Sequence, residues 1–223
     1  MKPTITLALA LAAAQHLCDQ ADVELVLPGD WRREAVVYAL AAVHGASGSG
    51  WDLAYAREHV SVTLPGAGVS LELLRQIPTV GPILADLSKG LKRPMILLSP
   101  SALADGVRLL GIVLHELGHV GSLRAGGPLW CLAYGVVGEV RAGAEAPCYG
   151  CDLAVSVHLG GADVDEREQA FVGSLDHYGL GDDGLKLARG IVRSCAEGVR
   201  RGDDLGGVVL DAELALRAVG WPG

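Results

Sequence analysis

The chain has 223 residues, of which 50% are hydrophobic but only 4% are aromatic, and its formal net charge at pH 7 is −8. At this length one domain spanning 1–223 is expected, with a core of Ala, Leu and Val that suits packed helices. The negative charge, and the absence of any Lys/Arg run longer than two, argue against nucleic acid as a partner. No apolar run approaches the ~18 residues that span a bilayer, so no membrane partner is expected.

The N-terminal part of the chain predicts a helix, a strand and a second helix. Residues 4–19 follow Lys2 as an apolar stretch, which imitates the charged and apolar regions of a signal peptide. Because the pattern continues into polar residues near its end, we predict a buried helix rather than a leader. A short strand is expected at 23–27, and Asp30 is the expected N-cap of a helix over 31–44.

The next segment predicts a loop followed by short elements. The Gly- and Ser-rich residues 45–50 suit a flexible loop. Residues 59–64 alternate apolar with polar side chains, which indicates a half-buried strand. Two short helices are expected at 69–77 and 82–89, and the apolar residues 95–98 predict another short strand.

The second half of the chain predicts helices throughout. A helix is expected to begin at Ser99, which can act as N-cap before a proline in the first turn. Glycines offer two places for it to end, at Gly121 and at 126–128. Further helices are expected at 130–139, 145–159, 163–178, 183–201 and 211–219. Together these elements predict an α+β fold that is mostly helical with a small sheet.

One motif in the first of these helices points to chemistry. Residues 115–119 read His-Glu-Leu-Gly-His, an HExxH pattern, directly after the apolar run 109–114. Residues four apart project from one face of a helix, so His115 and His119 can reach one metal ion. Glu116 can then act as general base rather than ligand, which is the arrangement of zinc peptidases. Gly118 lowers helix propensity, which indicates the close approach of a neighbouring element.

A catalytic zinc needs a third protein ligand. Ala125 stands where HExxHxxGxxH enzymes have a third histidine, so a downstream glutamate is expected instead. Glu139 and Glu145 are the candidates. Glu139 has the spacing from the motif that is seen in thermolysin-like gluzincins, but Gly143 stands where those enzymes have an aspartate.

The residues that follow carry a resemblance to a family. Arg141, Glu145, Ala146 and Tyr149 match R-x-x-x-E-A-x-x-Y, a signature that follows HExxH in many small zincin-like proteins, including phage and prophage ones. Over residues 95–160 the chain therefore resembles a gluzincin-like HExxH zinc metallopeptidase. The resemblance implies a zincin-like fold with its sheet beside the motif helix, and it implies Glu145 as the zinc ligand on the next helix.

Several neighbouring residues acquire expected roles from this arrangement. Proline is tolerated in the first turn of a helix, so Pro147 predicts that Glu145 lies at or just before a helix start, or that the helix is kinked. Asp152 is a candidate to orient a ligand histidine. Tyr149 is favoured as a transition-state stabiliser because it belongs to the signature. The other candidates for that role are Tyr134, His158, His177 and Tyr178.

The five cysteines fit a reducing environment, which together with the predicted N-terminal helix indicates a cytoplasmic protein. Cys148 and Cys151 form a CxxC pair with no second CxxC, so we expect small buried side chains, and a local disulfide or redox control is the alternative.

In zincins a strand beside the motif helix often binds substrate as an added strand, and residues 59–64 or 95–98 are candidates for that role.

The sequence thus predicts a zinc-dependent peptidase whose partner is a peptide or protein substrate. Zn²⁺ would lower the pKa of a bound water, and Glu116 would take its proton and pass it to the leaving amine. The alternative is a zincin-fold structural or assembly protein, of a kind related to phages, that binds zinc without turnover. A peptidase restricted to one regulatory partner is a third possibility.

Overall fold

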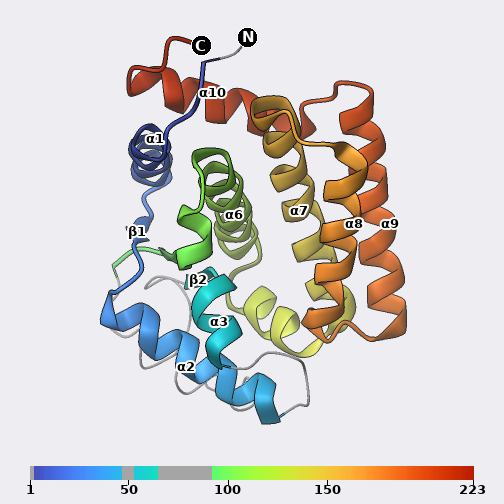
Figure 1. The fold of residues 1–223 in the computed structure, drawn as a ribbon. Helices are drawn as coiled ribbons and strands as arrows, with labels where there is room; N and C mark the ends of the chain where they lie inside the picture. Colours follow the sequence, from blue (N-terminus) through green and yellow to red (C-terminus); the bar gives the residue numbers. More distant parts are fainter. Residues whose placement is uncertain (1–2, 47–52, 65–91) are drawn as a thin grey trace.

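The computed structural model describes residues 3–46, 53–64 and 92–223 and is mostly helical with a small three-stranded sheet (Figure 1). The α+β class with mainly helical content is therefore confirmed. The helices predicted at 69–77 and 82–89, and all but two residues of the predicted loop at 45–50, lie outside the described residues. Those two residues belong to α2, which extends past the predicted end at 44.

The described part of the chain forms helices, 3₁₀ turns and three strands. The helices are α1 (Leu7–Gln20), α2 (Trp31–Ala46), α3 (Leu53–His59), α6 (Gly106–Val136), α7 (Gly138–Gly160), α8 (Val164–Ser174), α9 (Gly181–Arg200) and α10 (Val208–Ala218). The 3₁₀ turns are η1 (Pro100–Leu103), η2 (Leu175–Tyr178) and η3 (Leu205–Gly207). The strands are β1 (Glu24–Val26), β2 (Val62–Leu64) and β3 (Met95–Leu97).

The three strands confirm the predictions at 23–27, 59–64 and 95–98, with shorter bounds. Their order is β1-β3-β2, with β1 parallel and β2 antiparallel to β3. The strand 95–98 is therefore central and cannot accept an added strand. Among the described residues, β2 lies at an edge of the sheet.

Both faces of the sheet are covered, which the alternation in 59–64 did not predict. Leu64, Met95 and Leu97 pack on one face against Val36 of α2. Ile96 points the other way, into the large core that includes α1 and α6. Thr63, the polar residue of β2, consequently faces α6 and is half-buried. α3 was not predicted, because its seven residues make only two turns, too few for a periodic pattern.

The motif helix α6 begins and ends differently from the prediction. Ser99 caps the short turn η1, and α6 begins at Gly106 after Asp105, whose carboxylate accepts a hydrogen bond from the Arg108 backbone nitrogen at 2.8 Å. The end predicted at Gly121 is wrong, since buried residues on either side keep the helix packed. The predicted break at 126–128 is confirmed, because Gly127 has φ 59° and ψ −153° inside α6.

The next helix corrects two further expectations. The segment 130–139 is not one helix: α6 ends at Val136 and α7 begins at Gly138, so Glu139 lies in the first turn of α7. Glu145 and Pro147 lie in the interior of α7 rather than at its start. The proline is tolerated because both it and the residue four positions earlier, Gly143, are exposed, so water can bind the carbonyl that loses its helical donor.

The remaining helices follow the prediction with small shifts of their ends. The segment 163–178 divides into α8, capped by Asp163, and the turn η2. In Figure 1, α6 lies between α1 and α7, α8 and α9 lie beyond α7, and α2 and α3 lie at one end of the molecule. Within the described part of the chain, no helix has both the length and the apolar composition needed to cross a bilayer.

Candidate metal centre

The two motif histidines lie on the same side of α6 and are buried. Their rings meet edge to face with centroids 4.9 Å apart, and the residues are 7% and 9% exposed. This proximity follows from the i, i+4 spacing in a continuous helix. The surface that they present is covered by α7, which packs along α6.

Glu145 of α7 reaches both histidines at once. Its Oε2 atom lies 3.4 Å from Nε2 of His115, and its Oε1 atom lies 3.4 Å from Nε2 of His119. Ligands bonded at about 2.0–2.1 Å to a tetrahedral Zn²⁺ are about 3.3 Å apart, so these separations match a shared ion. Glu145 Oε2 is buried, and its one neighbouring donor among the described residues is Nε2 of His115 at 3.4 Å, the same nitrogen that a shared cation would bind. The carboxylate therefore fits the role of third ligand.

The outer nitrogen of His115 is held by Asp152. Nδ1 of His115 lies 3.1 Å from Oδ2 of Asp152, also on α7. A carboxylate in this position fixes the ring orientation and favours the tautomer that leaves Nε2 free for a metal. Helix packing is tight at this point, because a Cβ atom on Gly111 would lie 2.7 Å from the Asp152 carboxylate.

Cys148 occupies the corresponding position beside the second histidine. Its Sγ atom lies 3.8 Å from Nδ1 of His119. His115, His119 and Cys148 form a buried group that could bind a metal ion, since one ligand atom from each lies within 4.8 Å of the others. The expected close approach at Gly118 is present, because a Cβ atom there would lie 2.8 Å from the Cys148 sulfur.

Cys148 and Cys151 are free thiols and are not activated. Burial raises the pKa of Cys148, and burial together with Asp152 raises the pKa of Cys151 to about 11. Both thiols therefore remain protonated near neutral pH. The expectation of buried side chains in the CxxC pair is confirmed for Cys148, whereas Cys151 is half-buried.

The electrostatics of the cluster follow from burying opposite charges together. Burial lowers the pKa of His115, but the hydrogen bonds and charges of Asp152 and Glu145 outweigh it, so the pKa lies well above 6.5. For Glu145, burial raises the pKa, and the charges and hydrogen bonds of His119 and His115 outweigh it in the opposite direction. Without a metal, the cluster is an imidazolium–carboxylate pair, which a divalent cation can replace.

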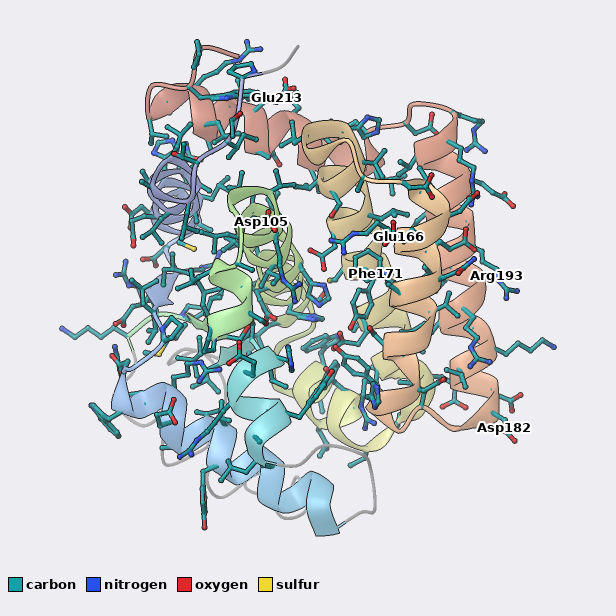
Figure 2. All side chains as sticks on the ribbon, in the orientation of Figure 1. Asp105, Glu166, Phe171, Asp182, Arg193 and Glu213 are labelled. Carbon is teal, nitrogen blue, oxygen red and sulfur yellow. The ribbon has the colours of Figure 1, made fainter. Side chains whose placement is uncertain are left out.

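Tyrosines complete the surroundings of the carboxylate. The Tyr134 hydroxyl, from the last turns of α6, donates to Oε1 of Glu145. Burial, with the adjacent Glu145 charge, raises the pKa of Tyr134, so the phenol keeps its proton. Tyr149 packs its ring edge to face on His115 with centroids 5.1 Å apart, and its hydroxyl lies 3.0 Å from that of Tyr178. Figure 2 shows Phe171 directed inward from α8, where it packs on Tyr149.

Arg141, the first residue of the signature, holds Tyr134 and Tyr178 through their backbone carbonyls. Its guanidinium donates to the carbonyls of Tyr134 at 3.0 Å and Gly135 at 2.8 Å. It also donates to the carbonyl of Tyr178 at 2.7 Å. The arginine thus joins the end of α6 to η2 beside the metal cluster.

Glu116 lies on another side of α6, as expected for a residue adjacent to a ligand in a helix. It is 6% exposed, and its Oε2 atom accepts a hydrogen bond of 2.7 Å from the Thr63 hydroxyl of β2. Thr63 was not identified from the sequence, where it read only as a polar residue of an alternating strand. Its position between Val62 and Leu64 was the one sequence feature that could have indicated a side chain on the other face of the strand.

The other predicted residues are dispersed. Glu139 is exposed in the first turn of α7 and does not join the cluster that Glu145 completes. His158 lies near the other end of α7, with Nε2 3.3 Å from the Asp203 carbonyl. His177 stacks at 5.9 Å with Tyr55 of α3.

Comparisons of the chain with models of protein families, with curated proteins and with solved structures gave no match. The geometry of the centre itself is therefore the basis for its chemistry.

Proposed function

We propose that this protein is a zinc-dependent peptidase with a zincin-like fold, in which His115, His119 and Glu145 hold the metal and Glu116 is the general base. Peptide bonds of a peptide or protein are the substrate. One observation carries the proposal: two imidazole Nε2 atoms from α6 each lie 3.4 Å from a carboxylate oxygen of Glu145 on α7. Three protein ligands leave one coordination position for water or substrate, as catalytic zinc sites do.

The donor set suits zinc on chemical grounds. Two imidazoles and one carboxylate are ligands of catalytic zinc in thermolysin and carboxypeptidase A. The buried Oε2 atom of Glu145 makes no hydrogen bond of good geometry among the described residues and lies 3.4 Å from Nε2 of His115, which supports a cation shared by the two atoms. Tyr134 and Asp152 supply outer hydrogen bonds to one ligand each, which fixes their orientation before a metal binds.

Each residue has a defined task in the proposed reaction. Zn²⁺, when bound, supplies a Lewis acid that polarises the carbonyl and acidifies water. Glu116 accepts a proton from the attacking water as its oxygen bonds to the carbonyl carbon, and delivers that proton to the amine nitrogen as the C–N bond breaks. Tyr149 and Tyr178 are candidates to donate to the developing oxyanion, because Tyr149 packs on His115 and its hydroxyl shares a hydrogen bond with that of Tyr178.

A second candidate function is favoured by the thiol of Cys148. If Cys148 is a fourth protein ligand, the site is closed and structural, as four-coordinate sites with Cys and His ligands are. The protein would then be a structural or assembly protein that binds zinc without turnover. The 3.8 Å contact of its sulfur is with Nδ1 of His119, whereas Glu145 faces Nε2 of both histidines, which favours the carboxylate.

Metal content of purified, zinc-supplied protein tests the ligand set. We expect one zinc per chain in the wild type and in Glu139→Ala, the exposed matched control, and a reduced content in Glu145→Ala. A wild type without zinc, or a Glu145→Ala variant that binds zinc as tightly as the wild type, would overturn the assignment.

Two further measurements separate the peptidase from the structural protein. Hydrolysis of an unstructured protein such as casein is expected from the zinc-loaded wild type. In the cobalt-substituted protein, a sulfur-to-cobalt charge-transfer band that disappears in Cys148→Ala would identify a closed site. Casein hydrolysis without that band supports the peptidase.

A further inference from the structure

Within the described part of the chain, a polar side chain of the sheet, Thr63 of β2, forms hydrogen bonds with the motif helix. Thr63 pairs with Ile96 in the ladder between β2 and β3, so it shares the face that Ile96 turns toward the large core. Its neighbours Val62 and Leu64 point to the opposite face, toward α2. Because side chains alternate along a strand, this register alone directs the hydroxyl toward α6, and a shift of one residue would replace it with an apolar side chain.

The hydroxyl meets the carboxylate of Glu116. Thr63 Oγ1 lies 2.7 Å from Oε2 of Glu116 and 3.1 Å from its backbone carbonyl oxygen. The shorter distance and the charge make the carboxylate the stronger acceptor. The two residues are 53 positions apart in the chain, so tertiary structure alone creates the contact.

We propose that Thr63 is the positioning residue of Glu116: its hydrogen bond to Oε2 holds the carboxylate in the orientation in which Oε1 takes the proton of the attacking water. This inference rests on the proposed peptidase function. A carboxylate on a helix surface has several rotamers, and a fixed donor on one oxygen selects among them. A base that is positioned before the reaction does not need to reorganise during it.

Ser61, the residue directly before β2, provides a matched control. Ser61 is two positions before Thr63, so in an extended chain both side chains point to the same face. The Ser61 hydroxyl, however, donates to Oγ of Ser99 at 3.2 Å and accepts from the Ser99 backbone nitrogen at 3.0 Å. It therefore fastens β2 to the start of η1 and does not touch Glu116. Removing the Thr63 hydroxyl should affect Glu116 directly, whereas removing the Ser61 hydroxyl should affect only the attachment of β2.

The test compares Thr63→Val, which keeps the shape and removes the hydroxyl, with Thr63→Ser, which restores it, and with Ser61→Ala. In the zinc-loaded protein Thr63→Val is expected to lower kcat about 10- to 100-fold with KM and zinc content unchanged. Thr63→Ser is expected to recover most of kcat, and Ser61→Ala to keep it. A wild-type kcat in Thr63→Val, or an equal loss in Ser61→Ala, would overturn the positioning role.

Thermal stability tests the contact between Thr63 and Glu116 independently of enzymatic activity. The loss of Tm caused by Thr63→Val in metal-free protein is expected to be larger with Glu116 present than in the Glu116→Ala background. An equal loss in both backgrounds overturns the inference. If the zinc-loaded wild type hydrolyses no peptide, the proposed function fails, and the Tm comparison still determines whether Thr63 and Glu116 are coupled.

Discussion

The two sides of α6 that carry the HExxH motif are built in different ways. On the side of α7, the histidines meet a carboxylate, a second carboxylate and a thiol, and glycines allow the helices to approach closely. On the side of the sheet, Glu116 meets one hydroxyl from the short strand β2. Several contacts from α7 hold the proposed ligands, whereas a single contact from a distant segment holds Glu116, the proposed base. Substitutions on the side of α7 should therefore alter metal affinity, and substitutions on the side of the sheet should alter turnover.

The largest effect is expected on the side of the base. Glu116→Gln keeps the size of the side chain but removes the proton acceptor, so peptidase kcat should fall about 10²- to 10⁴-fold. Zinc content should stay at the wild-type level, because Glu116 does not contact the histidine nitrogens that face Glu145. Loss of zinc in this variant would contradict the division between the two sides.

On the ligand side, Asp152→Ala should act on the metal first. Without its partner on Nδ1, the His115 ring is no longer held in the orientation that directs Nε2 at Glu145. Zinc affinity, measured by competition with a chelator, should fall about 10- to 100-fold. The exposed Asp176, which pairs with Arg189, provides a control: Asp176→Ala should bind zinc as the wild type does.

The tight helix contact can be tested through two glycines of the same helix. In Gly118→Ala the new Cβ atom would lie 2.8 Å from the Cys148 sulfur. Such overpacking costs about 1–3 kcal/mol of folding free energy, whereas alanine adds about 1 kcal/mol of helix propensity. The variant should therefore be no more stable than the wild type, and up to about 2 kcal/mol less stable. Gly121→Ala meets nothing within 4 Å, so it should stabilise the protein by about 1 kcal/mol. Chemical denaturation measures both. Adding Cys148→Ala should relieve the first variant, and a persistent cost would indicate another clash.

The smallest effect concerns the pH dependence of the metal-free protein. The raised pKa of His115 contributes stability that is complete below 6.5 and declines as pH rises through the shifted value. The lowered pKa of Glu145 contributes stability that is present above 4.5 and is lost as pH falls. The pair should therefore contribute most to Tm between about pH 4.5 and 6.5. The difference in Tm between wild type and Glu145→Gln, followed across pH, should peak there, and a flat difference would exclude the ion pair.

Part of the fold and of the candidate site could be predicted because the signals are local. Capping residues and apolar periodicity give most helices within a few residues, as for Asp30 before α2 and Asp163 before α8. The proximity of His115 and His119 needs only the pitch of one helix. The family resemblance singled out Glu145, which is the glutamate that lies beside both histidines.

Helix ends and the positions of strands in the sheet were harder to predict, because tertiary packing overrides the conformational preferences of single residues. Pro147 lies inside α7, where an exposed helix face tolerates the lost hydrogen bond, although the residue predicted a helix start. Residues 95–98 were a candidate to bind substrate as an added strand, but β3 is central in the sheet. No local pattern reports which strand will pair on each side.

The sequence by itself determined that His115 and His119 would lie on one side of a helix and Glu116 on another, since a helix repeats every 3.6 residues whatever surrounds it. Only the tertiary structure decided which side chains meet them. Tyr134 reaches Glu145 across the turn between two helices, and Thr63 reaches Glu116 across 53 residues. Such contacts depend on strand register and on the approach of α7 to α6, which arise from burying the whole core rather than from any short segment.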